Sequence, residues 1–137
     1  MAEIYFLSLA DVLALHEMVM ERFGSGPSPL RDERLLESAV MRSQMAAYYS
    51  DADIIRQSAL LAVDISQAQA FIDGNKRTAF AACDVFLRLN GLFFAGEPLA
   101  IAQQIEVITQ RKGDREAATN QFEQWLREHV APKPDTH

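Results

Sequence analysis

The segment Gln69–Phe80 reads QAFIDGNKRTAF and lies between two long apolar stretches of the chain. Its centre joins an acidic residue and a glycine, Asp73 and Gly74, to an amide residue, Asn75. Asp and Gly favour turns, and Asn is a good N-cap for a following helix. We therefore expect one central helix to end in this segment and a second helix to begin there.

Apolar residues recur at steps of three and four on both sides of this turn, which predicts a compact all-α bundle of about six helices. The helix before the turn is expected at Ile54–Phe71 and the helix after it at Lys76–Asn90, ending at Gly91. The others are expected at Ser8–Phe23, from Asp32 to about Met45, from Pro98 to roughly Arg111 and from about Asp114 to Val130. The first is predicted to bury Leu9, Val12, Leu13, His16, Val19, Met20 and Phe23, and the second Leu35, Leu36, Ala39 and Val40.

The remaining segments are expected to connect these helices. Gly24–Pro29, with its glycines and prolines, is the clearest loop, and Tyr48–Asp53 is predicted to be a turn. Phe93 and Phe94 form a short apolar link that could be extended. The final APKPDTH, residues 131–137, is expected to have nothing to pack against, so we predict one domain over residues 1–131 and a flexible tail over residues 132–137.

The composition excludes several classes of protein. The chain has 137 residues, 49% of them hydrophobic and 23% charged, and no apolar run approaches the roughly 20 residues of a membrane span. The N-terminus carries Glu3 and Asp11 without a basic leader, so a signal peptide is not predicted and a cytoplasmic location is expected. Cys83 is expected in the core. A net charge of −6 argues against direct action on nucleic acid.

Lys76 and Arg77 follow Asn75 at the predicted start of a helix. The first N–H groups of a helix have no partners within it, and the helix dipole adds partial positive charge, so this position can receive an anion. Basic side chains oppose that dipole at a small cost, which a bound anion offsets. Arg77 offers a planar fork for phosphate oxygens, and Gly74 lets the backbone approach closely.

Asp73 places a negative charge beside this expected anion site. It fits there if it holds Mg²⁺, which typically takes one or two carboxylates together with substrate phosphates. The spacing therefore indicates a nucleotide bound with magnesium. An alternative from spacing alone is that Asp73 only shapes the turn and that the basic pair is only solvated.

QAFIDGNKRTAF resembles the core motif of the Fic/Doc family, which begins with His, has Phe two residues later, and continues through an acidic residue, Asn and Arg. The segments VLALHEMVMERFG, LLESAVMR and VFLRLNG resemble further helices of this family, so the resemblance covers most of residues 1–110. It implies a compact all-α fold with the motif between two central helices. It also implies transfer of part of a nucleoside triphosphate onto a protein hydroxyl.

Two positions make the chain similar to the death-on-curing (Doc) branch of the family. Lys76 stands where the nucleotidyl-transferring branch has Gly, and Phe80 stands where that branch has a second Arg. The Doc branch implies a kinase that phosphorylates a threonine of elongation factor Tu, with ATP bound in a reversed orientation and Mg²⁺ present. An AMP-transferring enzyme is the alternative within the family.

The resemblance also implies a role for each residue of the motif. Asp73 would hold the metal, the first amides of the helix would cradle the transferred phosphate, and the basic pair would neutralise charge that builds in the transition state. The nucleotide- or phosphate-binding residues that it implies are Phe71, Gly74, Asn75, Lys76 and Arg77, and the catalytic residues are Gln69, Asp73, Asn75, Lys76 and Arg77.

Gln69 stands where the family has the His that accepts the proton from the attacking hydroxyl. A neutral amide can orient a hydroxyl but has no useful basicity, and loss of a general base typically costs about 10²–10⁴-fold in rate. We therefore expect strongly impaired transfer. Gln69 either belongs to a diverged member of the family or was introduced to disarm a toxin. His16 is expected to be a buried, hydrogen-bonded residue, with a second catalytic group as the alternative.

The resemblance finally implies a partner. The family's inhibitory motif, Ser/Thr-x-x-x-Glu-(Gly/Asn), is not evident in the chain, so inhibition is expected from a separate cognate antitoxin whose disordered tail folds into a groove. The leading prediction is the toxin of a toxin–antitoxin pair that transfers phosphate from ATP to a translation factor. The alternative from another class is a catalytically inactive module that binds nucleotide or antitoxin.

Overall fold

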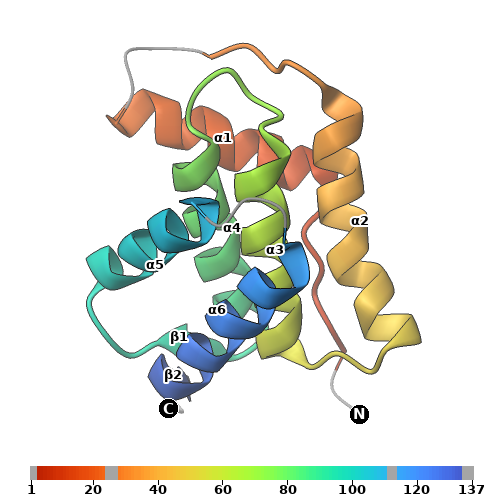
Figure 1. Ribbon diagram of the computed structural model, residues 1–137, viewed down its shortest axis with the longest axis vertical. Coiled ribbons are helices and arrows are strands. Elements are labelled where there is room, and N and C mark those ends of the chain that lie inside the picture. The colour runs from red at the N-terminus through yellow and green to blue at the C-terminus, as the bar shows by residue number, and fades with distance from the viewer. Residues whose placement is uncertain (1–2, 24–27, 111–113, 134–137) are drawn as a thin grey trace.

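The computed structural model describes residues 3–23, 28–110 and 114–133. Over these residues the fold is all-α, as predicted, with one small antiparallel ribbon (Figure 1). The helices are α1 (Leu9–Phe23), α2 (Glu33–Tyr49), α3 (Ile54–Ala68), α4 (Asn75–Leu89), α5 (Pro98–Gln110) and α6 (Arg115–His129), and the strands are β1 (Leu92–Phe94) and β2 (Val130–Pro132).

The core is built around α3, which packs against α2, α4, α5 and α6. Figure 1 shows α3 and α4 in the middle of the molecule, with α1 lying across their upper ends. Because α3 is covered on most sides, it is buried along most of its length, whereas the surface helices bury one stripe. Cys83 of α4 is fully buried, which confirms its predicted place, and burial raises the pKa of its thiol.

Polar side chains fix where the helices begin. Ser8, directly before α1, and Asp11, in its first turn, form a reciprocal pair with N–H to side-chain oxygen distances of 2.8 and 3.1 Å. Asp32, Asp53 and Asp114 each accept a backbone N–H at the start of α2, α3 and α6. These caps satisfy donors that have no partner within the helix.

Three predicted helix boundaries are wrong by a few residues. α2 continues to Tyr49 because the Ser50 N–H still bonds to the Ala46 carbonyl, so the predicted turn begins later. α3 ends at Ala68, because Gln69 takes the left-handed conformation that closes helices. Asn75 is the first residue of α4 and not its N-cap, a position that Gly74 occupies.

Two residues predicted to face inward are instead exposed. Phe23 is 62% exposed at the last position of α1, and Leu35 is 41% exposed on the outer side of α2. α2 is covered on one side only, so its buried stripe is narrow and consists of Leu36, Ala39, Val40 and Ser43. The periodicity predicted a wider buried face than the neighbouring helices cover.

The first residues after α6 pair with another segment, contrary to the expectation that the segment has nothing to pack against. Ala131 and Pro132 belong to β2, which pairs antiparallel with β1 in the register Leu92↔Pro132, Phe93↔Ala131 and Phe94↔Val130. The extended link predicted at Phe93 and Phe94 is thereby confirmed. Residues 24–27 of the predicted loop, the predicted helix end at roughly Arg111 and the last residues of the tail lie outside the described part of the chain. The division into domain and tail stays a prediction.

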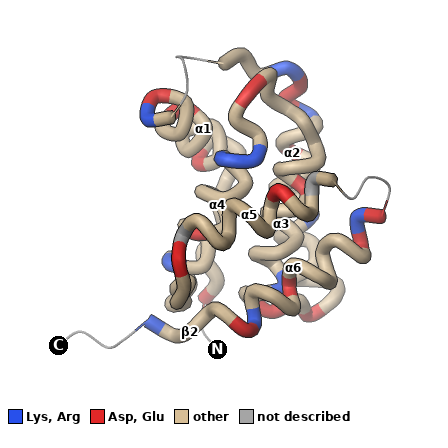
Figure 2. Tube along the Cα trace, turned by 60° about the vertical axis from the view of Figure 1, so that its left-hand side comes forward, with Lys and Arg blue, Asp and Glu red and all other residues tan. Residues whose placement is uncertain are grey.

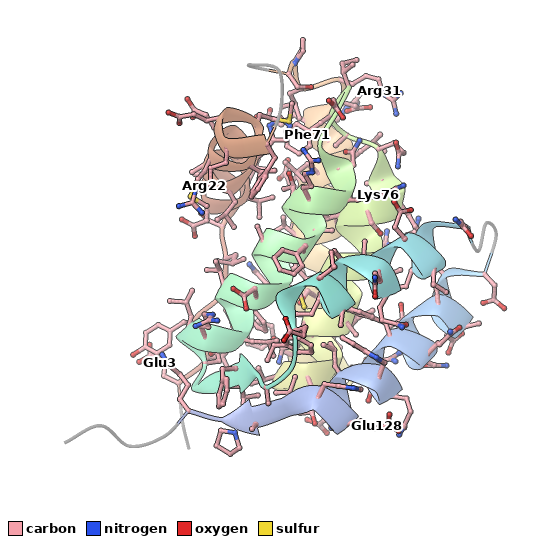
Figure 3. All side chains as sticks on the ribbon, turned by 90° about the vertical axis from the view of Figure 1, so that its left-hand side faces the viewer. Glu3, Arg22, Arg31, Phe71, Lys76 and Glu128 are labelled. Carbon is pink, nitrogen blue, oxygen red and sulfur yellow. The ribbon has the colours of Figure 1, made fainter. Side chains whose placement is uncertain are left out.

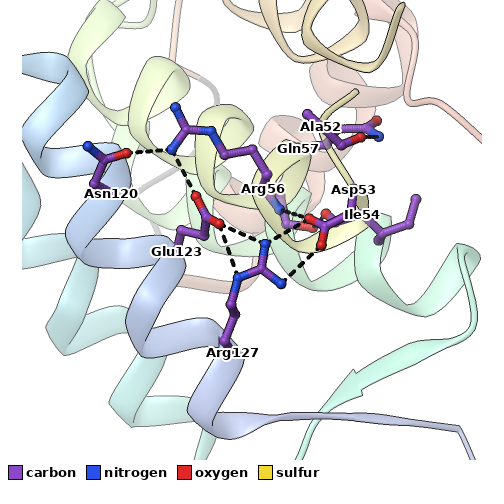
Figure 4. Close-up of polar contacts among 9 residues, drawn as sticks. Ala52, Asp53, Ile54, Arg56, Gln57, Asn120, Glu123 and Arg127 are labelled. Carbon is purple, nitrogen blue, oxygen red and sulfur yellow. Dashed lines mark hydrogen bonds and ion pairs between the residues drawn. The ribbon is translucent and has the colours of Figure 1, made fainter. Parts of the chain in front are cut away.

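Ion pairs join α6 to the N-terminal end of α3 (Figure 4). Arg56 lies 2.8 Å from Glu123, and Arg127 lies 3.0 Å from Asp53 and 2.7 Å from Glu123. Burial alone would raise the pKa values of Asp53 and Glu123, but hydrogen bonds and charges from the two arginines lower both overall. We call these four residues the α3–α6 network.

Asp64 is a buried carboxylate farther along α3. Its side chain is 1% exposed, and Oδ1 lies 3.2 Å from Arg42 of α2 and 3.6 Å from Arg115 of α6. Among the described residues, Oδ2 has no hydrogen-bond partner. Burial raises the pKa of Asp64 to about 6, although the charge and hydrogen bond of Arg42 act in the opposite direction.

Basic residues are interspersed with acidic ones along the described helices. None of these helices combines the length and apolarity needed to cross a bilayer. In the view of Figure 2, basic and acidic segments are interleaved along the trace. Any phosphate binding must therefore depend on a local arrangement of cations, which directs attention to the turn between α3 and α4.

Candidate active site

The predicted motif forms the turn between α3 and α4, and residues 28–32, which we call the strap, run beside it. Leu30 of the strap forms an antiparallel bridge with Phe71. The Arg31 N–H donates to the Ala70 carbonyl at 2.6 Å. Figure 3 shows Arg31, Phe71 and Lys76 toward the same end of the molecule. The strap satisfies backbone groups that the turn leaves without helical partners.

Gln69 closes α3 and folds its side chain back over the turn. Its φ is 53°, a left-handed value that is uncommon for a residue other than glycine. Its Nε2 donates to the Ser66 carbonyl at 2.8 Å, its Oε1 lies 3.4 Å from Nδ2 of Asn75, and its carbonyl accepts from Arg31. The structure therefore places a neutral amide at the position where the resemblance expects a base.

Asn75 braces the turn from inside. Its side chain is buried, accepting the Phe71 N–H at 3.1 Å and donating to the Phe71 carbonyl at 2.9 Å. Phe71 is 2% exposed and stacks on His16, with ring centroids 3.6 Å apart. The side chains of Asn75 and Phe71 are thus engaged within the fold. The part of the predicted phosphate cradle that can still receive an anion is the set of N–H groups that a helix start leaves without helical partners.

Gly74 lies where the turn touches α1. Its φ is +86°, and a Cβ added there would lie 2.6 Å from Sδ of Met20 and 3.3 Å from the ring of His16. Glycine is therefore required both by the backbone conformation and by the close approach of α1. The sequence suggested a different reason, the approach of a phosphate to the backbone.

Asp73 lies exposed at the tip of the turn. Its N–H donates to Oγ of Ser28 at 2.9 Å, and its Oδ1 accepts the Gly74 N–H at 2.8 Å. Within the described residues, no group of three or more His, Cys, Asp or Glu could hold a metal by itself. One exposed carboxylate fits Mg²⁺, which takes one or two carboxylates and completes its shell with phosphates and water.

The basic pair diverges from the turn toward two different helices. Lys76 Nζ lies 2.8 Å from Oε2 of Glu106 in α5. Arg77 donates to the Phe23 carbonyl at 2.8 Å, and its guanidinium carbon lies 5.4 Å from the centre of the Phe23 ring. Within the described residues, the polar and ring contacts of Arg77 are thus with neutral groups, so its charge stays available to an anion.

A groove of about 740 Å³ begins at the basic pair and runs between α1, α4 and α5. Its walls are largely apolar, and its lining also includes charged residues, among them the acidic Asp84 and Glu106. The apolar lining residues include Met18, Val19, Phe23, Phe80, Val85 and Leu99, and the basic ones are Arg22, Lys76 and Arg77. Phe80, where the nucleotidyl-transferring branch has Arg, therefore contributes to this groove.

The structure decides the role of His16 and adds contacts that sequence reasoning missed. His16 is 5% exposed, and its Nε2 lies 2.9 Å from the Asp73 carbonyl, so the predicted buried, hydrogen-bonded residue is confirmed. Ser28, Arg31 and Glu106 were not predicted to contact the turn. Each is distant in sequence from residues 69–77, and a polar residue in a loop or on a helix surface carries no signal of its tertiary partner.

Comparison with known proteins agrees with these observations. The family model described as the Fic/DOC family matches residues 6–87, which include the whole turn. The chain is 37% identical over 94 residues, 67% of this chain and 69% of the relative, to a protein named Toxin Doc from Mycolicibacterium smegmatis. It is 32% identical over 87 residues, 63% of this chain and 68% of the relative, to Protein kinase doc of Escherichia phage P1. The chain therefore belongs to the Fic/DOC family.

Proposed function

We propose that the chain is a Doc-type toxin that transfers the terminal phosphate of ATP to a hydroxyl of a translation factor, elongation factor Tu by resemblance. The observation that carries this proposal is Arg77, in the first turn of α4, whose guanidinium contacts neutral groups among the described residues. The start of a helix also offers N–H groups that can receive an anion. The names of the two relatives, a toxin and a protein kinase, support it.

The residues of the turn fit this transfer. The acceptor hydroxyl oxygen would bond to the γ-phosphorus, the bond from that phosphorus to the bridging oxygen would break, and ADP would leave. Arg77 and Lys76 would bind the phosphate oxygens and stabilise their charge, with Lys76 exchanging its contact with Glu106 for phosphate. Asp73 would hold Mg²⁺, which supplies further neutralisation of phosphate charge when bound.

Gln69 limits the reaction at the proton transfer. The hydroxyl proton must leave as the new bond forms, and an amide cannot accept it. In the structure, Gln69 is also engaged with the Ser66 carbonyl. The proton would then pass to solvent or to phosphate, and the transfer would be slower by about 10²–10⁴-fold than with a general base.

The test compares the chain with its Gln69→His variant, using purified elongation factor Tu, Mg²⁺ and ATP labelled at the γ-phosphate. We expect the His variant to label a threonine and the unchanged chain to label it far more slowly. The matched control carries Arg77→Ala in addition to Gln69→His, and it should lose the label. Equal labelling by both forms would show that another residue is the base.

A parallel reaction with ATP labelled at the α-phosphate distinguishes the family alternative. The proposal expects no transfer of this label, because Lys76 and Phe80 stand where the AMP-transferring branch has Gly and Arg. Label from the α-phosphate alone would replace the proposal with AMP transfer. Tight binding of Mg·ATP without transfer of either label, even with His at position 69, would identify a nucleotide-binding module.

We further propose that the groove between α1, α4 and α5 receives an amphipathic segment of the cognate antitoxin. Its apolar walls suit the apolar face of a helix, and the basic residues Arg22 and Arg77 in its lining suit acidic side chains, whereas Lys76 is paired with Glu106 of the same lining. The test is co-purification with the product of a short neighbouring reading frame. Leu99→Asp, in the groove and 67% exposed, should abolish it, whereas Tyr48→Asp, 70% exposed on α2, should not.

A further inference from the structure

His16 of α1 contacts three features of the motif turn with one side chain. Its Nε2 lies 2.9 Å from the Asp73 carbonyl, its ring stacks on Phe71 at an interplanar angle of 7°, and the Gly74 backbone passes close to the ring edge. The side chain is 5% exposed, so these contacts lie in the interior. A single buried residue of α1 therefore supports most of the turn.

The hydrogen bond shows that Nε2 of His16 carries a hydrogen. A carbonyl oxygen can only accept, so Nε2 of His16 must carry a hydrogen and donate it to Asp73. That nitrogen cannot also accept a proton from a substrate hydroxyl. Because His16 is also only 5% exposed, the geometry argues against it as a replacement for the missing base and leaves a role in support of Asp73.

The backbone of Asp73 is held on both sides. Its N–H donates to Oγ of Ser28 at 2.9 Å, and its carbonyl accepts from His16 at 2.9 Å. With both backbone groups fixed, the Cα–Cβ bond of Asp73 points in one direction, and only side-chain rotation remains. Residues that hold a metal-binding group from behind typically affect metal affinity by about 10–100-fold.

We propose that His16 is a positioning residue that aims the Asp73 carboxylate at the metal of a bound nucleotide. This inference rests on the proposed function, because it assumes that Asp73 holds Mg²⁺. It assigns to α1, a helix outside the motif, control over the orientation of the Asp73 carboxylate. Met20, one turn farther along α1, closes the space beside Gly74 and limits any shift of the turn.

The test measures binding of ATP with Mg²⁺ and with a chelator, and takes the ratio of the two dissociation constants as the gain from the metal. His16→Phe keeps an aromatic ring but has no donor, whereas His16→Gln can place an amide nitrogen near the position of Nε2. We expect His16→Phe to reduce the gain about 10-fold, with metal-free binding unchanged, and His16→Gln to retain it. The pair separates the hydrogen bond from the packing of the ring.

Asp73→Asn is the reference variant. It should lose the gain, and His16→Phe combined with Asp73→Asn should be no worse than Asp73→Asn alone, because both changes act on one carboxylate. If Asp73→Asn loses the gain but His16→Phe keeps it, the inference fails and the proposed function stands. If the unchanged chain shows no gain from the metal, the metal role of Asp73 fails, and the inference fails with it.

A second measurement does not depend on a variant that folds. In the unchanged chain, the ring nitrogens of His16 can be assigned by ¹⁵N nuclear magnetic resonance, together with exchange of the ring proton. We expect Nε2 to carry a slowly exchanging proton, as a buried hydrogen bond to a carbonyl requires. A neutral ring with its proton on Nδ1 alone would overturn the inference.

Discussion

The two ends of α3 both carry charged clusters, but the clusters are built in different ways. Where α3 begins, Arg56 and Arg127 contact the carboxylates of Asp53 and Glu123, so the α3–α6 network has two charges of each sign. Where α3 ends, Arg77 contacts a neutral carbonyl and an aromatic ring. The first cluster is neutralised within the fold, and the second keeps a charge that a ligand can use.

The charge of an arginine's partners distinguishes a structural arginine from a ligand-binding one better than the residue type does. Arginine in a closed network gains little from an added anion, because its carboxylate partners must first be displaced. Arginine on neutral partners at a helix start can bind phosphate without that loss. We therefore expect substitutions at the two ends to affect different measurements, one mainly transfer and the other mainly stability.

The largest expected effect is that of Arg77→Ala on transfer. In the Gln69→His background, it should lower the rate of γ-phosphate transfer by about 10²–10³-fold, as removal of a transition-state donor does. Thermal unfolding should change little, because the lost contact with Phe23 is exposed. A large fall in melting temperature with an unchanged transfer rate would show that Arg77 has a structural role and not a role in phosphate transfer.

Substitution of two glycines, Gly74 and Gly91, tests whether the turn depends on close packing against α1. Gly74→Ala should destabilise the fold by about 1–3 kcal/mol, because φ is +86° and the new Cβ would meet Met20. Gly91, with φ +82°, has no atom within 4 Å of an added Cβ, so Gly91→Ala should cost only the backbone term. Denaturant unfolding and ATP binding of both variants measure the difference. Equal effects on ATP binding would contradict the role given to α1.

Asp64, between the two ends, predicts a pH dependence of stability. Its pKa is raised to about 6 in the folded state from the ordinary value of 3.8, so its contribution is fully present below about pH 4 and is lost as pH rises through about 6. The slope from this group is at most about 1.4 kcal/mol per pH unit. Denaturant unfolding between pH 4 and 7 should show this slope in the difference between the free energies of unfolding of the unchanged chain and of Asp64→Asn.

Asp53 and Glu123 act in the opposite direction, because their pKa values are lowered in the folded state. Their contribution is present above the pKa of the unfolded chain and is lost as pH falls. The difference between the unchanged chain and Asp64→Asn cancels this background. A difference that is flat across the range would show that Asp64 is not as buried in solution as it is in the structure.

The smallest expected effect is that of Arg127→Ala, the counterpart of Arg77→Ala. It should lower the free energy of unfolding by about 0.2–1 kcal/mol, because its partners are partly exposed and screened. Binding of ATP should be unchanged. A loss of ATP binding equal to that of Arg77→Ala would mean that the two ends of α3 are coupled and that the comparison fails.

The sequence alone determined the helical class and the place of the turn. Spacing at three and four residues predicted six helices, because a helix that packs on a core repeats with that period. The run from Asp73 to Arg77 marked the turn and its charges, because caps, turn residues and adjacent cations act over a few neighbouring positions. The resemblance in Gln69–Phe80 then predicted the family that the comparisons show.

Only the tertiary structure decided how the turn is held. The strap beside it, His16 behind Asp73 and the contact of Arg77 with Phe23 join residues about 40 to 60 positions apart, and no local pattern encodes such pairs. It also showed a second reason why residue 74 is glycine, since a Cβ at this position would clash with Met20 of α1. Local preferences for turns and helix starts account for the residue types of the turn. Packing against residues distant in sequence determines which of their polar groups remain available to a ligand.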